Sequence, residues 1–226
     1  MIKKAISILL GIALVPFCIG FTWQLGMTVF EIRYKPDLPY FFVAGALAYS
    51  TLHLLFKKPI MAYVFGHELT HALFAVLFGG SVKSFHASDR GGRVTITKSN
   101  FIITLAPYFF PLYTFIVLLL YGTAVAAGLQ RAIAWLVFLA GATFAFHLVL
   151  TVIFLQTEQT DIREYGLIFS FPLIVLFNVT FTALLIRVLL AENMEYLAFL
   201  GGGIMKSINM TVLILGKIYR FAGNML

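Results

Sequence analysis

The sequence predicts an all-α integral membrane protein with six transmembrane helices and a short β-hairpin. Composition is the first observation: of 226 residues, 61% are hydrophobic, only 11% are charged, and the mean hydropathy is +0.98. A soluble domain is about 45–50% apolar and about 25% charged, and a domain this small still exposes about a third of its surface. The second observation is that the apolar residues form runs long enough to cross a bilayer. Together they exclude a soluble globular protein and a disordered one.

Six apolar segments have the length of about 20 residues that a helix needs to cross a bilayer. These predicted spans are residues 5–30, 38–56, 60–80, 101–122, 131–155 and 167–190. The first follows Met1-Ile2-Lys3-Lys4 and is interpreted as a retained span, because no small-residue cleavage site follows it. The tail carries Lys206, Lys217 and Arg220 among apolar residues, which favours an amphipathic helix in the membrane interface over a seventh span.

These segments predict one polytopic membrane domain over residues 1–226. Its core is expected at 60–190, with accessory spans at 5–30 and 38–56 and the amphipathic segment at 192–226. The net charge of +7 indicates contact with anionic lipid headgroups of the bilayer, and no nucleic acid is expected as a partner. The single cysteine excludes an internal disulfide and a thiolate metal cluster.

Glu68 is the only acidic residue inside a predicted apolar span. An ionisable group at membrane depth costs several kcal/mol, so it marks a candidate functional site. It belongs to His67-Glu68-Leu69-Thr70-His71, an H-E-x-x-H motif on a helix. Histidines four apart share one helix face and can bind one metal ion, and imidazole ligands with an open coordination position suit zinc. The motif therefore predicts one Zn²⁺ per chain, bound by His67 and His71, with Glu68 as the general base. The alternative is a polar helix face that is hydrogen-bonded to neighbouring helices.

This pattern resembles the site-2 protease family of intramembrane zinc metallopeptidases. The likeness covers roughly residues 60–170 and includes the motif, then Leu77-Phe78-Gly79-Gly80, and then a span that opens Leu105-Ala106-Pro107-Tyr108-Phe109-Phe110-Pro111. It is similar to the small prokaryotic members without a PDZ domain. The resemblance implies a multi-pass protein of the prokaryotic cell (inner) membrane, with transmembrane or membrane-proximal segments of other proteins as substrates.

The resemblance also implies a distant aspartate as the third zinc ligand. The family's Asn-Pro-Asp-Gly or Leu-Asp-Gly setting for that residue is absent, and Thr70 stands where the family usually has glycine. Asp161 is the best substitute because carboxylate is the family's ligand type. His147 is the rival, since its depth in its helix matches that of His71, and Glu158 is a third candidate. The choice stays open, and the residue of the pair that is not a ligand is a candidate for orienting one.

Two further features are expected near the motif. Residues 82–97 alternate around the turn Asp89-Arg90-Gly91-Gly92, which predicts a β-hairpin. Its edge could bind an extended substrate by backbone hydrogen bonds, or the hairpin could simply cover the mouth of the bundle. Pro107 and Pro111 are expected to kink the fourth span close to the zinc and to free backbone carbonyls there.

The sequence therefore predicts a zinc-dependent metalloprotease that hydrolyses peptide bonds at membrane depth. The alternative is a catalytically inactive membrane zinc protein that acts as a regulator or scaffold. A transporter is disfavoured because the chain shows no internal repeat.

Overall fold

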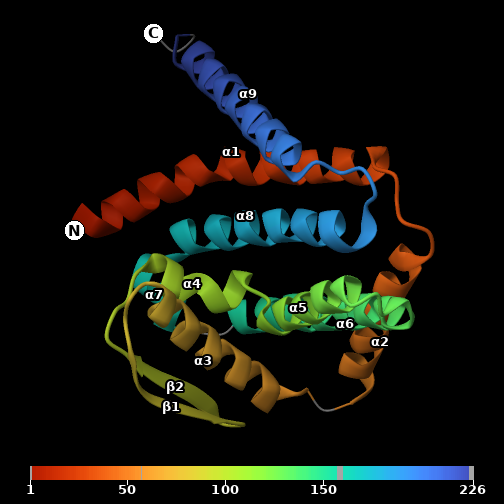
Figure 1. Cartoon of the computed structure of the whole chain (residues 1–226). Helices are drawn as coiled ribbons and strands as arrows, with labels where there is room; N and C mark the ends of the chain where they lie inside the picture. The colour runs from red at the N-terminus through yellow and green to blue at the C-terminus, as the bar shows by residue number, and fades with distance from the viewer. Residues whose placement is uncertain (1, 57, 157–159, 224–226) are drawn as a thin grey trace. The chain divides into compact units, whose positions relative to one another are not determined.

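The computed structural model describes residues 2–56, 58–156 and 160–223, and most of them are helical (Figure 1). Within this part of the chain, six helical segments are long and apolar enough to cross a membrane: Ala5–Glu31, Leu38–Leu55, Ile60–Leu77, Gln130–Leu155, Leu167–Leu190 and Tyr196–Phe221. A single two-stranded antiparallel sheet accompanies them in the described residues. The predicted fold class is confirmed.

One of the expected spans differs from the structure. Residues 101–122 do not form one straight helix, because α4 (Phe101–Phe109) and α5 (Leu112–Ala126) meet at an angle of 72°. The break falls at Phe110, whose extended backbone precedes Pro111; proline lacks an N–H and disfavours a helical conformation in the residue before it. The tail forms one continuous helix, α9 (Tyr196–Gly223), which is itself long enough to span. That it lies in the interface stays a prediction.

The chain divides into two compact units, residues 1–35 with 165–226 and residues 36–164, and each is described by itself. That the whole chain acts as one membrane domain stays a prediction. The first unit contains α1 (Ile2–Glu31), α8 (Leu167–Leu185) with the π-helical turn η1 (Ile186–Leu190), and α9. α1 packs on α8 and α9 through small residues: the backbone at Gly11 lies against the Ile168 carbonyl, and Gly20 lies against Ser207. Small residues at helix crossings are typical of membrane proteins.

The second unit contains α2 (Leu38–Leu55), α3 (Ile60–Leu77), α4, α5, α6 (Gln130–Leu155) and most of α7 (Thr160–Tyr165). α2 packs along α6, again with glycine at the crossing, since the backbone at Gly45 lies against the Phe138 carbonyl. α3 packs against α4 on one side and against both strands on another (Figure 1). This unit holds every residue of the predicted site that the structure describes.

The hairpin follows α3 directly. β1 (Val82–Ser88) and β2 (Gly91–Ile96) pair antiparallel, with Phe85 opposite Val94 and Ser88 opposite Gly91. Gly91 has a φ of 133°, a conformation that L side chains rarely adopt, so glycine is needed where the chain leaves the turn. The predicted hairpin is confirmed.

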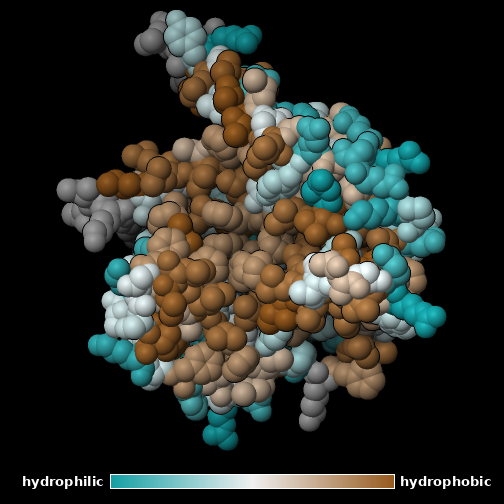
Figure 2. Space-filling view, in the orientation of Figure 1, coloured by the Kyte–Doolittle hydropathy of each residue, from teal (hydrophilic) through white to brown (hydrophobic). Residues whose placement is uncertain are grey.

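Large apolar side chains cover much of the helix surface, and Figure 2 shows them as broad hydrophobic areas. Leu54 of α2 is 84% exposed and Trp135 of α6 is 67% exposed. A soluble protein rarely leaves contiguous apolar surface of this extent in water. This apolar surface is compatible with contact to lipid tails, which agrees with a multi-pass membrane protein.

Candidate metal centre

The H-E-x-x-H motif lies in the middle of α3. Because residues four apart on a helix project from one face, the rings of His67 and His71 meet. Their Nε2 atoms are 3.2 Å apart. Both side chains are largely buried, with exposed fractions of 11% and 10%. The helix geometry predicted from the sequence is therefore present.

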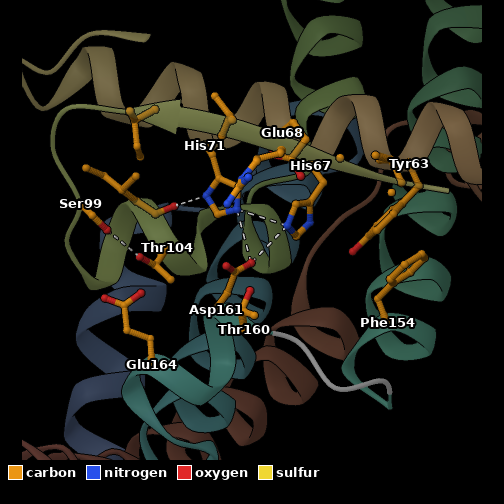
Figure 3. A pocket seen from close by; sticks show the side chains of 17 residues that line it. Tyr63, His67, Glu68, His71, Ser99, Thr104, Phe154, Thr160, Asp161 and Glu164 are labelled. Carbon is orange, nitrogen blue, oxygen red and sulfur yellow. Dashed lines mark hydrogen bonds and ion pairs between the residues drawn. The ribbon is translucent and has the colours of Figure 1, made fainter. Parts of the chain in front are cut away.

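Asp161 completes a group of three side chains with these histidines. It lies on α7, 94 positions after His67 in the sequence. Its Oδ2 atom is 3.3 Å from Nε2 of His67 and 3.4 Å from Nε2 of His71. Figure 3 shows the three side chains pointing toward one another from α3 and α7. Among the described residues, this is the one group of three or more potential metal ligands whose atoms all lie within 4.8 Å of one another.

The three ligand atoms fit a tetrahedral zinc ion. Zinc binds imidazole nitrogen and carboxylate oxygen at about 2.0–2.2 Å, which places neighbouring ligands of a tetrahedron about 3.3–3.6 Å apart. The separations here are 3.2, 3.3 and 3.4 Å. Two histidines and one carboxylate would fill three positions and leave the fourth for water or substrate, the arrangement of catalytic zinc sites.

A proline in α4 explains how the His71 ring is held. Nδ1 of His71 lies 2.9 Å from the carbonyl oxygen of Ile103. That carbonyl would normally accept the helical N–H of residue 107, but residue 107 is proline and has none. Because a carbonyl can only accept, Nδ1 of His71 carries a proton, and Nε2 would present its lone pair to a bound metal ion. The prediction that this proline frees a carbonyl near the site agrees with the structure.

Tyr108 holds Asp161 in place. Its hydroxyl donates to Oδ2 of Asp161 over 3.1 Å, and its side chain is fully buried. Burial raises the pKa of Asp161, but the hydrogen bonds with His67 and His71 outweigh burial and hold this pKa below its usual range. The carboxyl group is therefore ionised at neutral pH, as a metal ligand must be. No role for Tyr108 was predicted from the sequence. The available signal was a tyrosine in an apolar span, since a buried hydroxyl needs a partner.

Glu68 lies beside the group and contacts the hairpin. Its side chain and the strand β2 line the same cleft. Gly92 of β2 packs closely against the Glu68 side chain. A Cβ atom at position 92 would lie 2.5 Å from Cγ of Glu68 and 2.7 Å from Cγ1 of Val64. The strand next to the site therefore needs glycine at position 92 and limits where the Glu68 carboxylate can lie.

These side chains line one cleft of about 590 Å³. Its walls come from α3, β2, the start of α4, the end of α6 and α7 (Figure 3). One wall is apolar, where the rings of Tyr63 and Phe154 stack 4.2 Å apart next to Val64. The candidate ligands and Glu68 lie on the same cleft, which is large enough to admit several residues of an extended peptide.

The other candidate ligands lie elsewhere. His147 is buried on α6 at 7% exposure and does not belong to the group of three; it lines a second, smaller cavity that also reaches His67. Glu158 lies outside the described residues. The structure thus brings Asp161 to the histidine pair, although the assignment of the metal ligands itself remains a prediction.

The combination of apolar helices, a histidine pair, a carboxylate and a neighbouring glutamate is typical of membrane metallopeptidases. A family model described as Peptidase M50B-like matches residues 40–200. Because the match covers well over half of the chain, the protein belongs to this peptidase family, as the resemblance to site-2 proteases implied. Family membership identifies a metallopeptidase of the multi-pass membrane class. No curated protein and no solved structure matches the chain.

Proposed function

We propose that the protein is an intramembrane zinc endopeptidase that hydrolyses peptide bonds in transmembrane or membrane-proximal segments of other membrane proteins. The observation that carries this proposal is the convergence of His67, His71 and Asp161 beside Glu68 in one cleft. These three residues would hold one Zn²⁺, and the family implies the same ion.

Zinc, when bound, supplies Lewis-acid polarisation of water and of the scissile carbonyl. Glu68 follows His67 directly on α3 and lines the same cleft, so its carboxylate accepts the proton of the attacking water. It then passes that proton to the leaving amine, which makes it general base and general acid in turn. The strand β2 packs closely against the Glu68 side chain at Gly92, and the Tyr108 hydroxyl restrains Asp161 from α4.

The hairpin provides a way to bind the substrate in an extended form. A helical segment hides its peptide bonds in internal hydrogen bonds, and within a bilayer those bonds must be replaced when the helix unwinds. β2 pairs with β1 along one edge, and its residues Gly91–Val94 line the cleft. A substrate strand added along β2 would receive backbone hydrogen bonds and lie beside Glu68.

An inactive zinc protein that serves as a regulator or scaffold is the second candidate. The chain's own feature that favours activity is Glu68, which the inactive protein would not need. The cellular setting, a prokaryotic inner membrane, rests on the resemblance to the small prokaryotic members of the family.

The test is to purify the protein in detergent and compare wild type with Glu68→Gln. Zinc content is measured by elemental analysis, and cleavage of a library of transmembrane peptides in micelles is followed by mass spectrometry. Glu68→Gln should retain zinc and lose about 10²–10⁴-fold in cleavage rate, the usual contribution of a general base. Equal cleavage by both proteins, or a wild-type protein without zinc, would refute the peptidase proposal.

A further inference from the structure

The two histidines of the site differ in how their second ring nitrogen is satisfied. Nδ1 of His71 donates to the Ile103 carbonyl. Nδ1 of His67 is buried and has no hydrogen-bond partner among the described residues. When Nε2 of His67 ligates the zinc ion, Nδ1 is the nitrogen that carries the proton. A metal-binding histidine almost always donates that proton to a carboxylate, a backbone carbonyl or water.

A second buried polar atom lies nearby. The hydroxyl of Tyr63, one turn before His67 on α3, is also buried without a partner in the part of the chain that the structure describes. The two rings are 5.7 Å apart, and Figure 3 shows them side by side. A buried polar atom without a hydrogen bond costs about 1–3 kcal/mol. The Tyr63 hydroxyl and Nδ1 of His67 are two such atoms close together, and they need an explanation.

A cavity of about 20 Å³ touches both residues. His147 of α6 lines it as well, and this residue is buried, with 7% of its surface exposed. A buried water needs a cavity of at least about 10–15 Å³ and two to four polar partners. The cavity therefore has room for one water molecule, and Tyr63, His67 and His147 are among the polar side chains that line it.

We propose that this cavity is the site of one structural water, which accepts the Nδ1 proton of His67 and bonds to the hydroxyl of Tyr63 and the ring of His147. The water would fix the tautomer and the orientation of His67 as the Ile103 carbonyl does for His71. Tyr63 and His147 are then positioning residues that act on a zinc ligand through the water. This inference rests on the proposed zinc site, and it gives His147 a role that is not ligation.

The experiment measures zinc affinity, so it does not depend on a substrate. Zinc dissociation constants are measured by competition with a chromophoric chelator, with every variant built in the Glu68→Gln background. Tyr63→Phe removes one oxygen and keeps the ring, and His147→Leu removes the imidazole. Each should weaken zinc binding about 10–100-fold, the usual effect of losing such a partner.

The chain offers a matched control pair. On α2, the hydroxyl of Tyr49 lies 3.1 Å from Nδ1 of His53, and neither residue lines this cavity. Tyr49→Phe and His53→Leu make the same chemical changes at that place and should leave zinc affinity unchanged. His147→Gln keeps a hydrogen-bonding group in the cavity and should recover most of the affinity lost in His147→Leu.

A double variant distinguishes a shared water from general damage. If one water joins both residues, Tyr63→Phe with His147→Leu should bind zinc about as weakly as either single variant, because the second change removes nothing further. Multiplied losses in the double variant, unchanged affinity in both single variants, or equal losses in the control pair would overturn the water site. Normal zinc binding in all variants would leave the peptidase proposal intact, whereas cleavage by Glu68→Gln would refute only the peptidase proposal.

Discussion

The Tyr108 hydroxyl gives the sharpest prediction for the proposed metal site. Tyr108→Phe removes only the oxygen that donates to Oδ2 of Asp161 over 3.1 Å, and the phenylalanine ring fills the same buried space. A hydrogen bond to a charged group is worth about 1.5–3 kcal/mol. Asp161 has a side-chain exposure of 22%, so water can partly replace the lost donor, and the lower end of that range applies. Because each 1.4 kcal/mol is tenfold, zinc affinity should fall about tenfold.

The assay is zinc competition against a chelator in the purified protein, and Tyr49→Phe is the matched control. The Tyr49 hydroxyl lies 3.1 Å from Nδ1 of His53 on α2, and Tyr49 lines neither the cleft nor the small cavity beside His67. That variant should bind zinc like the wild type. If Tyr108→Phe and Tyr49→Phe bind zinc equally, the hydroxyl does not position the carboxylate and Asp161 is not held as described.

Three more perturbations test the surroundings of the site. Gly92→Ala should displace Glu68, because the new Cβ would lie 2.5 Å from Cγ of that side chain, and the cleavage rate should fall at least tenfold while zinc content stays the same. The control is Gly122→Ala, whose new Cβ would lie in open space. Unchanged cleavage by Gly92→Ala would contradict the close packing of β2 on Glu68. Pro107→Ala restores an N–H that competes with His71 for one carbonyl, so zinc should dissociate a few-fold faster in a stopped-flow chelator experiment, and an identical rate would argue against that role. Removing zinc with a chelator should lower the melting temperature of the wild type and leave that of His71→Ala unaltered, because a ligand that binds only the folded state stabilises it.

The part of the site that sequence predicts well is the part contained in one helix. His67 and His71 are four residues apart, and helix geometry alone places them on one face. The hairpin was predictable for a similar reason, since alternation and a glycine turn act between neighbouring residues. Nothing local relates Asp161 to this helix, however, and the sequence favoured it as third ligand without excluding His147.

The broken span and the tail also show which features local sequence predicts and which depend on packing. Pro111 signalled a kink, and the break falls beside it, but the 72° angle between α4 and α5 depends on what each helix packs against. The tail was interpreted as interfacial because of its cations, whereas its length and apolar content also suit a span. For the tail, the charge pattern therefore favours an interfacial helix, whereas the length and apolar content suit a transmembrane helix, and the choice depends on how α9 packs.

The sequence by itself determined the membrane class, the histidine pair and the glutamate beside it, because composition and helical periodicity act within a few residues. The tertiary structure decided which carboxylate meets the pair, that Tyr108 restrains it, that a proline frees the carbonyl for His71, and that a small cavity lies beside His67. These features join segments up to 94 positions apart. Such contacts depend on how helices pack against one another, which local periodicity does not encode.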